Sequence, residues 1–230
     1  MTIVKELKIS KGDLYHKSVK SAMSLVPFVG GVLSEAFTTI VTEPSSKRRD
    51  NILMLFDERI NEVASRVDGL EINILKNDGV FLSTVLQAFQ IAMRTHQQEK
   101  IAALLNAITN AALSENVEEN EQHMFLMVID SFTELHLRLL LFFYSPDKLC
   151  QEKGLKFPDF VLKDNLINVT EKIFPDLKGK FELYSQVSKD LFLRGLLNND
   201  PFNLDWEHNS MNFSVTPMGK QFIDFISQTN

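Results

Sequence analysis

Apolar residues recur at helical spacing through roughly the first 145 residues of the chain. Thr42-Glu43-Pro44 has the residues of a helix start, and the predicted helix ends near Gly69. From residue 52 on, its aliphatic and aromatic side chains fall at offsets near three and four, and charged side chains take most of the other positions. Similar stripes cover residues 80–95 and 101–112, and another helix follows a polar stretch at 114–122. The pattern predicts a bundle of amphipathic helices over residues 1–130.

Helices continue into the second half of the chain. Residues 131–134 (SFTE) have the spacing of a capping box in front of the apolar run LHLRLLLFFY, which Ser145-Pro146 ends. The apolar pattern predicts further helices at 163–174 and 181–197.

A different pattern follows the last of these helices. Residues 202–207 form one predicted strand, and residues 211–215, which alternate apolar and polar, form a second. Thr216-Pro217 then begins a final predicted helix. Three helices, a small β-hairpin and a closing helix are the order of a winged-helix-like module, which we place at residues 131–230. The predicted fold class is therefore mainly α, with a helical bundle followed by this module.

One segment near the start of the chain is unusually apolar. Between residues 22 and 42 the only charged side chain is Glu35, but proline and glycine interrupt the segment. We interpret residues 19–42 as an apolar helical hairpin, with membrane insertion on activation as the alternative. The residues at its bend are Pro27, Phe28, Val29, Gly30 and Gly31.

Charge and cysteine content narrow the functional classes. The 24 basic and 30 acidic residues give a net charge of −6, so binding to nucleic acid would need a local basic surface. Cys150 is the sole cysteine, which excludes an intramolecular disulfide and suits a reducing compartment. The start of the chain also lacks the features of a signal peptide, so we expect a cytoplasmic protein.

No catalytic motif can be assigned from the sequence. The five histidines are scattered, without the H-x-x-x-H or H-E-x-x-H spacing that would place two imidazoles on one helix face. A P-loop and a G-x-S-x-G elbow are also missing. Pro158-Asp159 and Asp176-Leu-Lys178 match a metal-dependent nuclease motif only formally, because they fall around helices and turns. We therefore expect no enzymatic activity, no metal and no cofactor.

Two groups of cations are candidates for interaction. The first is a cluster at a predicted helix start, which suits phosphate or lipid headgroups but equally a solvated helix face: Lys47, Arg48 and Arg49. The second lies on the helix in the recognition position, where Lys189 and Arg194 are balanced by Glu182 and Asp190. Because binding to DNA phosphates needs several cations, we expect a protein partner or a second copy there, and DNA is disfavoured.

The order of these parts resembles the prokaryotic abortive-infection alpha-type helical proteins. The shared features are a Pro/Gly-broken apolar segment (VPFVGGVLSEAF), an arginine-bearing helix (KRRDNILMLFDERI), an alanine-rich block (FLSTVLQAFQIAMRTHQQEKIAALLNAITNAAL) and a closing SVTPMGKQFIDFI typical of bacterial winged-helix modules. The resemblance is one of architecture over most of the chain. It implies a role in bacterial anti-phage defence and brings no catalytic residues.

Three functions follow as hypotheses. The leading one is a non-enzymatic defence protein that acts through protein–protein contacts. The alternatives are a winged-helix transcriptional regulator and a membrane-active effector that uses the apolar hairpin.

Overall fold

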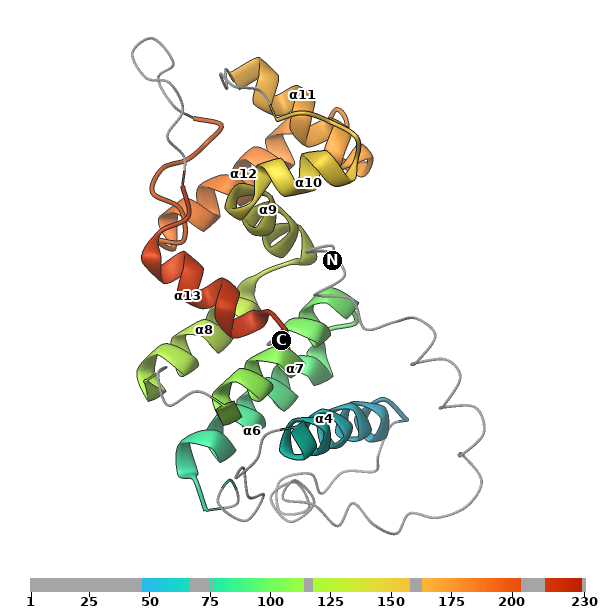
Figure 1. Ribbon diagram of the computed structural model, residues 1–230, viewed down its shortest axis with the longest axis vertical. Coiled ribbons are helices and arrows are strands. Elements are labelled where there is room, and N and C mark those ends of the chain that lie inside the picture. Colours follow the sequence, from blue (N-terminus) through green and yellow to red (C-terminus); the bar gives the residue numbers. More distant parts are fainter. Residues whose placement is uncertain are drawn as a thin grey trace. The chain divides into compact units, whose positions relative to one another are not determined.

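The computed structural model describes residues 47–66, 75, 77–113, 118–157, 163–203 and 214–228. Among these residues the chain divides into two compact units (Figure 1). The first unit contains residues 47–131 together with 225–228, and the second unit contains residues 132–224. The fold is mainly helical, as the apolar pattern predicts.

Among the described residues, the first unit contains four helices and the last residues of a fifth. The four are α4 (Lys47–Arg66), α6 (Gly79–Arg94), α7 (Gln98–Leu113) and α8 (Glu119–Ser131). Helix α7 packs against the other three, and every residue from 100 to 110 is buried. Its alanines allow this close approach, because Ala103 and Ala107 have no exposed surface. The helix stripes predicted for this part of the chain are confirmed.

Local chemistry fixes where α6 begins. The Asp78 side chain accepts hydrogen bonds from the Val80 and Phe81 amides at 2.9 and 3.1 Å, which satisfies two donors that the helix itself leaves open. Further along, Phe89 meets Phe56 of α4 edge to face, with ring centroids 5.9 Å apart. The cap and this aromatic contact set the register of α6 in the unit.

The second unit is also helical in its described residues. They are α9 (Glu134–Tyr144), α10 (Pro146–Glu152), α11 (Lys163–Ile173), the 3-10 turn η1 (Pro175–Leu177), α12 (Phe181–Leu193) and the start of α13 (Pro217–Ile226). Helix α9 lies against α12 and α10, and α11 packs on η1. Helix α13 begins in this unit, while its last residues belong to the first.

Aromatic rings fill the core of the second unit. Phe142 meets Phe174 at 6.0 Å between ring centroids, and Phe143 meets Phe202 at the same separation. Tyr184 of α12 lies 5.1 Å from Phe202. Because each ring removes a large apolar area from water, these contacts hold α9, α12 and the segment after α12 together.

The β-hairpin predicted as a wing is not supported by the described residues. Residues 204–213 lie outside them, and Phe202 and Asn203 belong to a turn. Val215 forms an isolated antiparallel bridge with Leu197. Where the first predicted strand would begin, the Asp200 carboxylate accepts the Phe202 amide at 3.2 Å, which turns the chain and buries the Phe202 ring.

Within the closing SVTPMGKQFIDFI, Thr216, Gly219 and Phe222 form a T-x-x-G-x-x-F pattern, which has a structural explanation in the second unit. The Thr216 hydroxyl accepts the Gly219 amide at 2.9 Å and donates to the Gly195 carbonyl at 2.6 Å. A Cβ on Gly219 would collide with the Leu196 carbonyl, so only glycine allows this approach. Phe222, one turn later, is fully buried. The pattern therefore caps α13 and docks it on the chain that follows α12.

Candidate functional site

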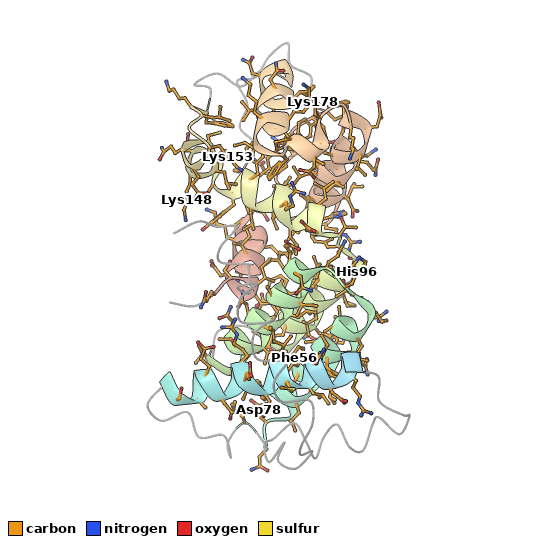
Figure 2. The ribbon with its side chains drawn as sticks, turned by 90° about the vertical axis from the view of Figure 1, so that its right-hand side faces the viewer. Phe56, Asp78, His96, Lys148, Lys153 and Lys178 are labelled. Carbon is orange, nitrogen blue, oxygen red and sulfur yellow. The ribbon has the colours of Figure 1, made fainter. Side chains whose placement is uncertain are left out.

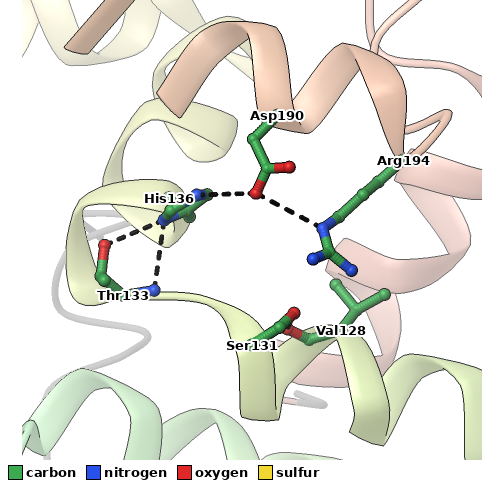
Figure 3. A network of polar contacts seen from close by, with 6 residues as sticks. All are labelled: Val128, Ser131, Thr133, His136, Asp190 and Arg194. Atoms are coloured by element: carbon green, nitrogen blue, oxygen red, sulfur yellow. Dashed lines mark hydrogen bonds and ion pairs between the residues drawn. The ribbon is translucent and has the colours of Figure 1, made fainter. Parts of the chain in front are cut away.

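A cluster of polar side chains in the second unit joins the start of α9 to α12 (Figure 3). Thr133 is the N-cap of α9, and its backbone amide donates to Nδ1 of His136 at 3.2 Å. The Thr133 hydroxyl lies 2.9 Å from the same nitrogen. This is a capping box with histidine in the third helical position. The cap begins two residues after the predicted one, because Ser131 ends α8 and donates to the Val128 carbonyl.

The hydrogen bonds fix the tautomer of His136. An Nδ1 atom that accepts a backbone N–H carries no proton, so the neutral ring is protonated at Nε2. That nitrogen lies 3.2 Å from Oδ2 of Asp190 on α12, to which it donates. Since His136 is buried, the bond replaces water that the ring has lost.

Asp190 also pairs with a cation one helical turn further along α12. Nε of Arg194 donates to Oδ2 of Asp190 at 3.4 Å. The guanidinium carbon lies 5.3 Å from the centroid of the Phe132 ring, and Phe132 stacks on His136 at 4.6 Å between centroids. One carboxylate and one buried ring therefore connect the imidazole and the guanidinium.

This network is suited to positioning helices. A general base needs a free lone pair within reach of its substrate. Both nitrogens of His136 are already engaged, one by the Thr133 amide and one by Asp190. The arrangement orders the start of α9 against α12, and its chemistry is that of a structural hydrogen-bond network.

Large apolar side chains are exposed on α12. Leu183 is 51% exposed, Phe192 39% and Leu193 67%. Leu183 and Phe192 are nine residues apart, about two and a half turns, so they lie on opposite sides of the helix. Phe192 and Leu193 are adjacent, and we call these two residues the α12 surface. Scattered apolar side chains are normal on a protein surface, whereas neighbouring ones are a feature of contact surfaces. Glu182, Gln186 and Lys189 are also exposed on this helix.

The cations predicted as interaction residues differ in their exposure and in their partners. Lys189 is exposed, whereas Arg194 is half-buried and held by Asp190 and Phe132. In the 47–49 cluster, Lys47 and Arg48 lie in α4 but their side chains are outside the described residues, and Arg49 pairs with Asp50 at 3.1 Å. The hairpin residues Pro27, Phe28, Val29, Gly30 and Gly31 all lie outside the described residues.

The acids of the formal nuclease match have no shared site in the described residues. Asp176 forms a two-pronged pair with Arg138 at 2.7 and 2.9 Å, and this hydrogen bonding lowers the pKa of Asp176. Asp159 lies outside the described residues. Across the ranges that the structure describes, acids, histidines and cysteines form no group of three suited to holding a metal ion.

Other ionisable groups are exposed singly or engaged in packing. His96 lies exposed between α6 and α7, and Lys153 and Lys178 extend into solvent from the second unit (Figure 2). Lys100 of α7 is buried and donates to the Asp130 carbonyl at 2.9 Å, and burial lowers its pKa. Burial and the neighbouring Glu171 raise the pKa of Tyr184 to about 12. These shifts belong to groups within packed helices.

Two polar residues of the first unit also have structural roles that the sequence pattern did not reveal. Asn106 and Asn110 are buried on α7, and their side-chain amides donate to backbone carbonyls at the end of α13. The only sequence signal is a pair of amides four residues apart on the otherwise apolar face of LLNAITNAAL.

Comparison of the chain with protein-family models, with curated proteins and with solved structures found no match. The resemblance to abortive-infection proteins therefore stays a prediction. Among the described helices, none has both the length and the apolar character needed to cross a bilayer.

Proposed function

We propose that the protein is a non-enzymatic bacterial protein of phage-defence type that acts through protein–protein contacts. In this proposal the second unit is winged-helix-like, α12 occupies the recognition position, and the α12 surface docks a protein partner. The exposure of Phe192 and Leu193 carries the proposal, because burying such side chains on association is favourable. The defence role rests on the family resemblance and on no residue-level observation.

The same helix is poorly equipped to bind DNA. Tight binding releases counterions from several phosphates, each neutralised by a lysine or arginine. Lys189 is the cation within α12, Arg194 at its C-cap is already paired with Asp190, and Glu182 adds an exposed negative charge. A partner with an apolar surface suits α12 better than a polyanion.

The test is a phage challenge of bacteria that carry the gene in its native operon. We expect fewer plaques with the wild-type gene than without it, and loss of this protection in Leu193→Asp. Met127→Asp is the matched control, because Met127 of α8 is also a large exposed apolar residue, 51% accessible. Equal plaque counts with and without the gene would refute the defence role.

Two further outcomes separate the parts of the proposal. Protection that survives Leu193→Asp would leave the defence role standing and remove the α12 surface from it. A mobility shift of upstream DNA at low salt that is lost in Lys189→Ala would instead favour a transcriptional regulator.

A further inference from the structure

The cap at the start of α9 requires one protonation state of the His136 ring. The Thr133 amide donates to Nδ1 of His136 at 3.2 Å, so this nitrogen must carry a lone pair and no proton. His136 occupies the third position of α9, where a capping box usually has glutamate or glutamine. Unlike glutamine, an imidazole can gain a proton near neutral pH, and the new Nδ1–H would face the Thr133 amide hydrogen. The cap is therefore complete only while the ring is neutral.

Three features of the surroundings disfavour a charged ring. The His136 side chain is 11% exposed, and burial penalises the charged form. The ring belongs to the first turn of α9, where the open amides of the helix create a positive potential. The Phe132 ring, on which His136 stacks, also contacts the Arg194 guanidinium, so a charged imidazole would lie near another cation.

Asp190 acts in the opposite direction. Its Oδ2 atom lies 3.2 Å from Nε2 of His136 and would pair with a charged ring. The same oxygen already accepts from Nε of Arg194 at 3.4 Å, and the Asp190 side chain is 36% exposed. Arg194 and solvent therefore both weaken the attraction of this carboxylate for a second cation.

The other charged side chains on the helices near His136 are engaged elsewhere or exposed. On α9 itself, Arg138 pairs with Glu134 at 3.9 Å and with Asp176 at 2.7 Å. Helix α10 begins after the far end of α9, about 12 Å along the helix from His136. The exposed members of this set are Glu182 and Lys189 of α12, Asp147, Lys148 and Glu152 of α10, and Lys220 and Asp224 of α13.

We propose that His136 makes the start of α9 acid-sensitive, so that protonation of its ring releases the Thr133 amide and loosens the first turn of the helix. The charged ring keeps Asp190 as a partner, and its Nδ1–H can donate to the Thr133 hydroxyl, 2.9 Å away. The Thr133 amide, however, loses its acceptor. The proton comes from bulk water, and no bond between heavy atoms changes. This inference is independent of the α12 surface and of the proposed defence role.

A cap that needs the neutral ring and an ion pair that needs the charged ring predict opposite pH dependences of stability. With the cap, the unfolded chain takes up a proton below about pH 6.5, the ordinary value for histidine, while the folded chain resists it. We expect the equilibrium constant for urea unfolding to increase by up to about tenfold as pH falls from 6.5 to 5.5. A dominant ion pair would lower this constant over the same range.

His136→Gln is the matched control. Glutamine at the third helical position keeps an acceptor for the Thr133 amide and does not titrate. The difference between wild type and this variant therefore separates His136 from the other histidines. Equal pH dependences in the two chains, or a difference of the opposite sign, would overturn the proposal.

Amide hydrogen exchange of the wild-type chain locates the change and does not depend on the folding of a variant. Each exchange rate is divided by the intrinsic rate of that amide at the same pH. We expect the protection of the Thr133 amide to fall several-fold between pH 7.5 and pH 5.5. The reference is the Val80 amide, which the Asp78 carboxylate caps at 2.9 Å without an imidazole. Equal changes at the two amides would contradict an acid-sensitive cap.

Discussion

Substitution of Asp190 separates the two interactions that this carboxylate makes. Asp190→Ala removes both the acceptor for His136 Nε2–H and the partner of Arg194. Asp190→Asn keeps an oxygen acceptor for the imidazole and removes only the charge. The comparison therefore isolates the hydrogen bond that orders α9 against α12.

The magnitudes follow from burial. The His136 side chain is 11% exposed, and an unsatisfied donor at such a site costs about 1–3 kcal/mol. The Arg194 side chain is 35% exposed and its pair with Asp190 spans 3.4 Å, so that pair contributes under about 1 kcal/mol. Alanine has a higher helix propensity than aspartate, which offsets roughly half a kcal/mol of the loss in Asp190→Ala. We expect losses of about 1–3 kcal/mol for Asp190→Ala and under about 1 kcal/mol for Asp190→Asn.

The assay is urea unfolding monitored by circular dichroism. The dependence of the unfolding free energy on urea concentration is compared between variants, to check that one cooperative step is being measured. Nitrogen NMR of the His136 ring gives an independent result, because the structure requires the Nε2–H tautomer. Equal stability losses in the two Asp190 variants would refute the reasoning. So would a neutral ring protonated at Nδ1.

Three other predictions concern single groups. In Gly219→Ala the new Cβ meets the Leu196 carbonyl, so we expect a loss of about 1–3 kcal/mol in urea unfolding, whereas Gly79→Ala, with open space at its Cβ, should cost nothing. Because the pKa of Tyr184 is raised to about 12, the free energy of unfolding should fall as pH rises from 10 toward 12, and Tyr184→Phe should remove that slope. Because the pKa of Asp176 is lowered, its charged form stabilises the fold at pH values above the ordinary pKa range of a carboxyl group, and this contribution should be lost as pH falls through the lowered pKa. Asp176→Asn should therefore reduce the loss of unfolding free energy in acid by under about 1 kcal/mol.

The helices were predictable because their apolar spacing and their caps agree. On α7 the alanines and leucines mark a face that is buried in the structure, and Thr216 with Gly219 mark the start of α13. Local signals of this kind depend on residues within a turn or two of one another. They are sufficient for the element type and place most boundaries within a few residues.

The candidate site was not predictable in the same way. His136 is an ordinary member of the run LHLRLLLFFY, and its partner Asp190 lies 54 residues away. Asn106 donates to a carbonyl 120 residues further along the chain. The predicted wing is not supported by the described residues, where Asp200 holds Phe202, the first residue of the first predicted strand, in a turn. Long-range hydrogen bonds leave little trace in a single sequence.

These buried polar contacts bear on where function lies. An apolar core tolerates many packings, whereas a buried amide or imidazole is satisfied in one geometry only, so each such contact selects a single pairing of helices. The hydrogen bond of His136 fixes the packing of α9 against α12, and that of Asn106 fixes the position of the end of α13 on α7. Side chains committed in this way position helices. Phe192 and Leu193, by contrast, are exposed to solvent on α12, and the proposed action through protein–protein contacts rests on them.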